Sequence, residues 1–169
     1  MEHSIPALII GAILILASSL TARTSLQSYY QIGQSLRSME TRLGEQSQTR
    51  LTIVDIDLDG QRNTLTVQLR NDGQTRLAAF DRLDVLITYY TSATTRVSLW
   101  LPYTASNPPA ANNWTVASIS SDAYDPGILN PGETAEVVIE LSPSVYQNTT
   151  NLFVISSEAG VSVSAPFTS

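Results

Sequence analysis

Three aspartates at alternate positions form the part of the chain that most resembles a metal-binding motif. Asp55, Asp57 and Asp59 stand in the run Asp-Ile-Asp-Leu-Asp-Gly that ends at Gly60, and this run matches the front half of a calcium loop. The last ligand of such a loop is a Glu six residues beyond the glycine, where this chain has Thr66. The same residues also predict a strand that ends in an Asp-Gly hairpin turn. The strand reading places Asp55 and Asp57 on one face, and Val54, Ile56 and Leu58 on the other.

Other side chains that could perform chemistry are scarce. The chain has no Cys and no Lys, and its single His is His3. Nucleophiles that depend on a thiolate, a lysine amine or a histidine base therefore lack their residues. We expect no enzymatic activity, no cofactor and no small-molecule substrate.

Two Asn-x-Thr triplets are candidates for covalent modification. They begin at Asn113 and Asn148, and each lies in or beside a predicted loop. Such triplets are acceptors for N-glycosylation in extracellular proteins, so both asparagines are candidate sites if the domain lies outside the cell.

Charge is unevenly distributed along the chain. The net charge is −6, and residues 101–169 contain six acidic residues and no basic residue. An acidic surface repels the phosphates of nucleic acids, so we expect no nucleic-acid partner.

The chain begins with a segment that is long enough to cross a membrane. Residues 4–22 contain no charged side chain, and as a helix they rise about 28 Å, close to the roughly 30 Å of a bilayer's hydrocarbon core. A cleaved signal peptide needs a basic region before the apolar run, and Met1, Glu2 and His3 provide none.

An apolar spacing of three and four residues continues beyond this segment. From Leu26 to Leu43 the large apolar residues fall on one side of a predicted helix, which would then reach to about residue 48 and be roughly 65 Å long. This side could cover the chain's own β core or pack against other copies. The residues that we expect to pack in a helical core between copies are Ile5, Leu8, Ile9, Ala12, Ile13, Leu16, Leu20, Leu26, Tyr29, Ile32, Leu36, Met39 and Leu43.

The remainder of the chain has the pattern of a β protein. Runs of β-branched and alternating residues are separated by turns rich in Gly, Asn, Asp and Pro. We predict an α+β fold, in which a long N-terminal hydrophobic helix (residues 1–49) precedes an immunoglobulin-like antiparallel β-sandwich (residues 50–169). The predicted strands cover residues 51–58, 64–70, 83–91, 96–101, 114–119, 134–141, 152–157 and 161–167.

Two short sequence segments in the β region, here called phrases, follow the apolar helix. With that helix, they make the chain resemble an archaeal flagellin (archaellin) of the type IV pilin-like superfamily. The first is Val-Gln-Leu-Arg-Asn-Asp-Gly at 67–73, followed by a strand at 83–87. The second is Leu-Asn-Pro-Gly-Glu at 129–133, which leads into a strand at 137–141. The resemblance covers nearly the whole chain. It departs from the family in showing no basic leader, and Glu2 does not occupy the usual position of the bacterial pilin glutamate.

The resemblance implies a structural subunit of an extracellular, homo-oligomeric helical filament that serves swimming. It also implies that the helix sits in the membrane before assembly, and that an assembly ATPase and a membrane platform build the filament. Three other functions fit the same sequence: an adhesive type IV-like pilus subunit, an archaellum stator protein anchored to the cell-surface layer, and a single-pass anchored binding or enzyme domain.

Overall fold

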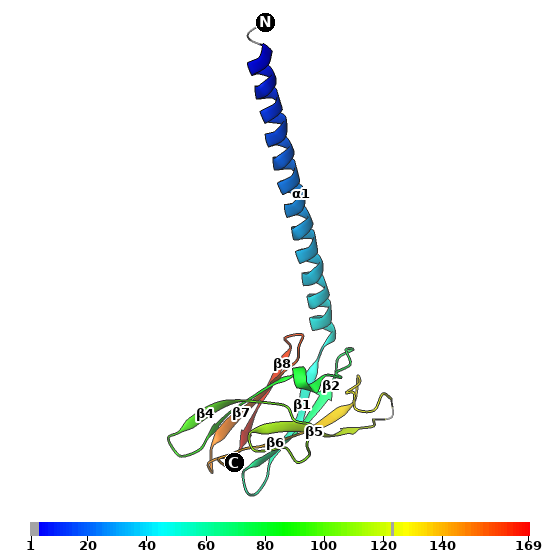
Figure 1. The fold of residues 1–169 in the computed structure, drawn as a ribbon. Coiled ribbons are helices and arrows are strands. Elements are labelled where there is room, and N and C mark those ends of the chain that lie inside the picture. Colours follow the sequence, from blue (N-terminus) through cyan, green and yellow to red (C-terminus); the bar gives the residue numbers. More distant parts are fainter. Residues whose placement is uncertain (1–3, 123) are drawn as a thin grey trace. The chain divides into compact units, whose positions relative to one another are not determined.

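The computed structural model describes residues 4–122 and 124–169, apart from the side chains of residues 4–8, 12, 17, 42 and 45. It divides into a helical unit that ends at Leu43 and a second unit, Gly44–Ser169. One helix, α1 (Ser4–Gln48), runs through the first unit and contributes its last turn to the second (Figure 1). The predicted long N-terminal helix is confirmed.

Hydroxyl side chains of α1 are satisfied within the helix itself. Ser18 Oγ donates to the carbonyl of Leu14 at 2.7 Å, and Thr24 Oγ1 donates to the carbonyl of Leu20 at 2.9 Å. Such bonds to the preceding turn remove the need for water around a polar side chain. The serines and threonines in and beside the apolar segment are therefore compatible with a lipid environment.

The second unit is a sandwich of two four-stranded antiparallel sheets (Figure 1). One sheet has the order β1-β2-β6-β5 and the other the order β4-β3-β7-β8. The predicted antiparallel sandwich is therefore confirmed. The strands are β1 (Leu51–Leu58), β2 (Thr64–Asn71), β3 (Asp84–Tyr90), β4 (Arg96–Leu101), β5 (Asn113–Ser120), β6 (Thr134–Glu140), β7 (Thr150–Ser156) and β8 (Ser162–Thr168).

The sandwich closes its own hydrophobic core. Every residue of the buried apolar cluster lies between Leu51 and Phe167, so no side chain of α1 that the structure describes belongs to it. Alternation along the strands directs these side chains inward: in β2, for example, Leu65, Val67 and Leu69 are buried and their neighbours are not. Trp114 is fully buried and meets the ring of Tyr103 edge-on, with 5.0 Å between the ring centroids. The core therefore needs no disulfide and no helix to cover it.

Two local features differ from the sequence-based expectation. Strand β1 contains a bulge between Ile53 and Asp55, which leaves Val54 as the extra residue. Val54 is consequently exposed, whereas Ile56 and Leu58 are half-buried, so the expectation that all three share one face is wrong. A short 3₁₀ helix, η1 (Phe80–Arg82), precedes β3 and buries Phe80.

The turn between β1 and β2 is organised by Asp59. Its Oδ1 accepts hydrogen bonds from the backbone N–H groups of Asn63 at 2.9 Å and Thr64 at 3.0 Å. Partial burial acts to raise the pKa of Asp59, but the backbone N–H groups of the turn outweigh it and lower the pKa below 3.8. The residue with a left-handed backbone is Arg62, at φ 61°, and not Gly60.

Replacement of Asp59 tests this turn. We expect Asp59→Ala to lower the free energy of unfolding by up to about 1 kcal/mol near neutral pH, because two backbone donors lose a charged acceptor. Since the pKa of Asp59 is lowered by folding, its charge stabilises the fold above pH 3.8 and ceases to do so as the pH falls through the folded value. Denaturation of the full chain in detergent, repeated at several pH values, measures this effect.

Asp59→Asn is the matched control, because it keeps the accepting oxygen and removes the charge. Its difference from the unmodified chain should shrink below pH 3.8. A pH-independent difference would contradict the assignment. Stabilisation of the unmodified chain by added calcium would instead support a metal site.

Candidate interaction surfaces

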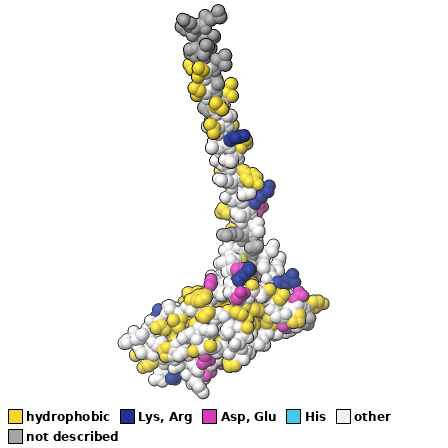
Figure 2. Space-filling view, in the orientation of Figure 1, with side chains coloured by type: hydrophobic (Ala, Val, Ile, Leu, Met, Phe, Trp, Pro, Cys, Tyr) yellow, Lys and Arg dark blue, Asp and Glu magenta, His cyan; other side chains and the backbone are white. Residues whose placement is uncertain are grey.

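The apolar side of α1 is the most extensive exposed surface of its kind in the described residues. The helix stripe consists of Leu26, Tyr29, Ile32, Leu36, Met39 and Leu43, and these residues are 55–73 % exposed. From Tyr29 onwards their spacing alternates between three and four residues, which is the a/d pattern of a coiled coil. Figure 2 shows apolar side chains (yellow) along α1, with polar atoms between them.

The apolar segment that precedes the stripe is equally uncovered. Ile9, Ile13, Leu16 and Leu20 are exposed, whereas the side chains of Ile5, Leu8 and Ala12 lie outside the description. By length and composition α1 can cross a membrane. Packing of these residues against other chains stays a prediction.

A second apolar surface lies on the outward face of the β4-β3-β7-β8 sheet. The sheet row consists of Trp100, Leu86 and Val154, which are register partners on adjacent strands. Trp100 is 59 % exposed, and its indole N–H donates to Asp84 Oδ1 at 3.0 Å. Aromatic side chains held in this way on an exposed face are typical anchors of protein interfaces.

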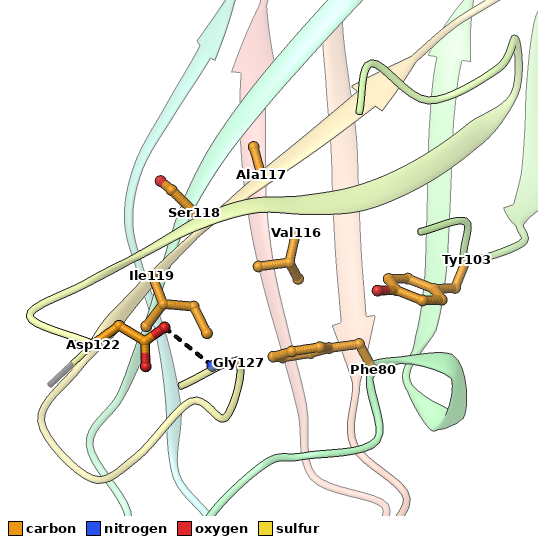
Figure 3. Close-up of a pocket in the computed structure, with 8 residues that line it drawn as sticks. All are labelled: Phe80, Tyr103, Val116, Ala117, Ser118, Ile119, Asp122 and Gly127. Atoms are coloured by element: carbon orange, nitrogen blue, oxygen red, sulfur yellow. Dashed lines mark hydrogen bonds between the residues drawn. The ribbon is translucent and has the colours of Figure 1, made fainter. Parts of the chain in front are cut away.

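A crevice of about 280 Å³ opens between β5 and η1 (Figure 3). Phe80, Tyr103, Val116 and Ile119 face the hollow. Asp122 is its single carboxylate among the described residues, and Asp122 Oδ2 accepts a bond from the N–H of Gly127 at 3.0 Å. One carboxylate that already stabilises a loop does not make an acid–base pair, so the crevice does not resemble a catalytic site.

The structure does not bring the three aspartates of the calcium-like run together. Asp55 and Asp57 are exposed on β1, while Asp59 accepts bonds from its own turn. Within the residues that the structure describes, no group of three or more His, Cys, Asp or Glu is placed to hold a metal ion. The hairpin is the reading that the geometry supports.

The two phrases that carry the family resemblance meet at the end of the sandwich where the chain enters β1. Asn71 is fully buried, and its side-chain amide donates to the carbonyls of Thr75 at 2.8 Å and Leu129 at 3.1 Å. Its backbone carbonyl accepts a bond from Gly132 at 2.7 Å. One buried side chain thus connects two turns that lie about sixty residues apart in the sequence.

The same turn binds the end of α1. The carbonyl of Gln48 accepts bonds from the N–H groups of Gln74 at 2.7 Å and Thr75 at 3.3 Å. These donors satisfy a carbonyl that the helix itself leaves unpaired. Gly73 lies so close that a Cβ there would be 2.5 Å from both Gln48 O and Arg50 N. We call this contact between residues 48–50 and 71–75 the junction.

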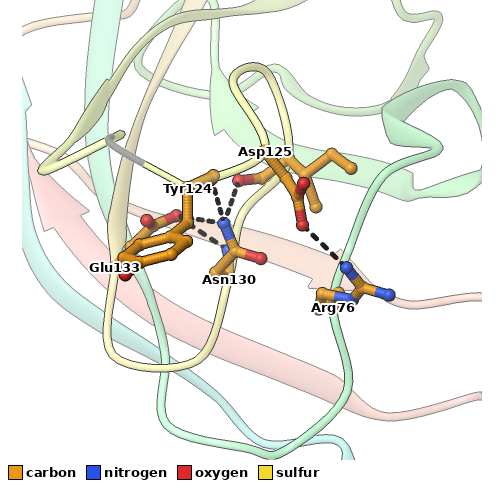
Figure 4. A network of polar contacts seen from close by, with 6 residues as sticks. Arg76, Tyr124, Asp125, Asn130 and Glu133 are labelled. Carbon is orange, nitrogen blue, oxygen red and sulfur yellow. Dashed lines mark hydrogen bonds and ion pairs between the residues drawn. The ribbon is translucent and has the colours of Figure 1, made fainter.

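Polar contacts stabilise the second turn of the pair (Figure 4). Glu133 Oε2 accepts a bond from the backbone N–H of Asn130 at 2.8 Å, and the side-chain amide of Asn130 donates to the carbonyl of Tyr124 at 2.8 Å. Arg76 forms an ion pair with Asp125 at 2.8 Å. This pair is exposed, so it contributes little to stability, and the Asn130 bonds are the more important ones.

Besides Asp59, a second carboxylate and a phenol on the sandwich have shifted pKa values. A hydrogen bond from Arg70, together with one from Thr52 and the charges of Arg70 and Arg50, lowers the pKa of Asp72. Burial raises the pKa of Tyr89, whose hydroxyl donates to the carbonyl of Pro143 at 3.0 Å. The neighbouring arginines and Thr52 account for the shift of Asp72, and burial accounts for that of Tyr89.

Gly73→Ala tests the junction. The added Cβ overlaps backbone atoms that cannot rotate away, so we expect the free energy of unfolding of the sandwich to fall by about 1–3 kcal/mol. Gly60→Ala is the control, because nothing lies within 4 Å of the added carbon. Denaturant titration of both variants measures the difference, and equal stability of the two would contradict the close approach.

Comparison with known proteins relates this architecture to the archaellum. The family model described as conserved flagellar protein F, immunoglobulin-like domain, matches residues 47–164. No curated protein matches the sequence significantly.

Several solved structures share the fold. The archaellum periplasmic stator protein FlaG from Sulfolobus acidocaldarius is 24 % identical, with 70 % of this chain and 99 % of that chain aligned at a TM-score of 0.54. A chain of the FlaF and FlaG stator complex of the same organism has 24 % identity, 70 % and 89 % coverage and a TM-score of 0.53. The archaeal flagellum of Methanospirillum hungatei strain JF1 covers 97 % of this chain and 92 % of its own, at 13 % identity and a TM-score of 0.58.

At these identities the structural likeness shows the fold alone, whereas the family model covers more than half of the chain. The predicted relation to the archaellum is supported, but the match is to flagellar protein F and not to the archaellin subunit that the sequence phrases resembled. The chain belongs to the family of conserved flagellar protein F, with residues 47–164 as its immunoglobulin-like domain.

Proposed function

We propose that the chain is a membrane-anchored, stator-type component of the archaellum. The observation that carries this proposal is the match of flagellar protein F to the sandwich. In this role α1 anchors the chain in the membrane, and the sandwich lies outside the membrane and attaches the motor to the cell-surface layer. The chain is a structural protein and performs no chemistry.

The two halves of the helix support this role in different ways. Residues 4–22 match the thickness of a bilayer, and the helix continues for 26 residues to Gln48, which adds about 39 Å. The helix stripe lies in this second half. We propose that it packs against helices of other archaellum components or of other copies, because lipid does not cover it there.

The sheet row supports a contact with a second immunoglobulin-like domain. The solved stator complex contains two such proteins, FlaF and FlaG. An exposed tryptophan beside two aliphatic side chains offers an anchor for a partner of that kind. We therefore propose that Trp100, Leu86 and Val154 bind a homologous stator protein from the same cell.

A filament subunit is the second candidate function. The likeness to the archaeal flagellum favours it, because that alignment extends over 97 % of this chain and so includes α1. In that case the chain forms a homo-oligomeric helical filament, and an assembly ATPase and a membrane platform build it from membrane-inserted subunits.

Deletion of the gene separates these roles. If the chain is a stator component, we expect the deletion strain to assemble filaments but not to swim. The protein should then be scarce in filaments sheared from unmodified cells. A filament subunit predicts cells without filaments, and an adhesive pilus subunit predicts cells that swim but do not attach. Electron microscopy, swimming assays and the composition of sheared filaments distinguish the three, and either of the last two outcomes would reject the stator proposal.

A point variant tests the sheet row. We expect Trp100→Ala to weaken binding of the homologous stator protein at least tenfold, because a central aromatic anchor is lost. The free energy of unfolding should change by less than about 0.5 kcal/mol, since the side chain is largely exposed. Tyr124→Ala is the matched control, because Tyr124 is 82 % exposed and lies in a loop away from the row. Equal binding by the two variants would show that the partner binds elsewhere.

A further inference from the structure

Both Asn-x-Thr triplets lie at the end of the sandwich opposite the entry of β1. Asn113 pairs with Glu140 at the end of β6, and the backbone N–H of Asn148 donates to the carbonyl of the C-terminal Ser169 at 3.0 Å. The two triplets nevertheless differ in how accessible their side chains are to an enzyme in the solvent.

The triplet at Asn113 is part of the sandwich core. Asn113 is half-buried at the start of β5, Trp114 is fully buried, and Thr115 is only 1 % exposed. The backbone of Trp114 is also bonded on its outer side, to the carbonyl of Pro102 at 3.1 Å and the N–H of Thr104 at 2.9 Å. Although Asn113 itself is half-exposed, Thr115 is accessible only if this part of β5, with the core residue Trp114, leaves the folded domain.

The triplet at Asn148 is presented by a structured loop. Asn148 and Thr150 are both exposed, and within the described residues the carboxamide of Asn148 makes no hydrogen bond. The backbone of Asn148 is left-handed, with φ at 56°, which asparagine tolerates better than most residues. Around it, Thr149 Oγ1 and Ser169 Oγ both donate to the carbonyl of Tyr146 at 2.6 Å. The loop is therefore held in place while its carboxamide stays free.

We infer that Asn148 is an N-glycosylation site of the folded protein and that Asn113 is not. The inference rests on the proposed function, which places the sandwich outside the membrane. The donor is a lipid-phosphate-linked oligosaccharide. The carboxamide nitrogen of Asn148 forms a bond to the anomeric carbon of the first sugar and loses a proton to a base. The bond from that carbon to the phosphate oxygen breaks, and the lipid phosphate leaves with the electron pair.

The position of Asn148 gives the glycan a structural role. It lies beside the C-terminus and the ends of β7 and β8, at the opposite end of the sandwich from the junction. A bulky, hydrated sugar there covers the far end of the domain and leaves the sheet row on the face of the sheet open.

The test uses the full chain purified from its native cells. Cleavage after glutamate gives a peptide of residues 141–158 that contains Asn148 but not Asn113, whereas residues 46–133 contain Asn113 but not Asn148. We expect a glycan mass on the first peptide and none on the second. Asn148→Gln and Thr150→Ala should abolish the added mass, and Asn113→Gln should leave it unchanged.

Protease treatment of intact cells distinguishes failure of this inference from failure of the proposed function. If the protease cuts the sandwich and the peptide of residues 141–158 has its unmodified mass, the glycosylation site is refuted while the outside location stands. If the sandwich is protected and unmodified, both are refuted. A glycan on the peptide that contains Asn113 overturns the assignment of the site.

Discussion

The rest of the structure depends on one constraint, which is that the apolar side chains of α1 need cover from outside the chain. Transfer of a large apolar side chain from water contributes about 1.5–3 kcal/mol, and the helix stripe alone presents six such residues at 55–73 % exposure. Their combined cost in water is comparable with the whole stability of a typical domain, about 5–15 kcal/mol. Lipid or the side chains of other proteins can provide this cover. The helix therefore requires contact with lipid or with other chains. The sandwich, which closes its own hydrophobic core, can act as a separate module.

The resemblance to archaellins has a physical basis at the junction. The phrases at 67–73 and 129–133 do not surround a ligand. They fold into adjacent turns that are connected through the buried amide of Asn71. Gln74 and Thr75, which directly follow the first phrase, donate to the carbonyl of Gln48 at the end of α1. Any protein that joins a long helix to the first strand of such a sandwich has to satisfy helix carbonyls at this point. A shared phrase can thus reflect the same connection between helix and sandwich in proteins that have different roles in the same machine.

The sequence was sufficient for the architecture because periodicity is a local signal. The helix and the eight strands were predicted within a few residues, since clean alternation in β2 and turn residues at 71–73 and 130–132 mark their limits. The helix stripe was predicted from its spacing, but the sheet row was not. Leu83 to Ile87 is nearly continuous in apolar residues, so nothing in the run shows that Leu86 faces outward beside Trp100. The bulge at Val54 was missed for the same reason, because an extra residue in a strand depends on its partner strand. The role of Gly73 follows from a close approach in three dimensions that no spacing encodes.

The direction in which the chain enters the sandwich determines how the domain carries a load. Residues 49–50 lead straight into β1, which is paired with β2 over seven register positions, and the C-terminal residue lies at the other end of the sandwich. Hydrogen bonds in an antiparallel ladder lie perpendicular to the strands. A pull that acts along β1 therefore strains all of these bonds together in shear, and does not open them one after another as in a zipper. The domain is therefore expected to resist a pull along β1 better than a pull that separates β1 sideways from β2.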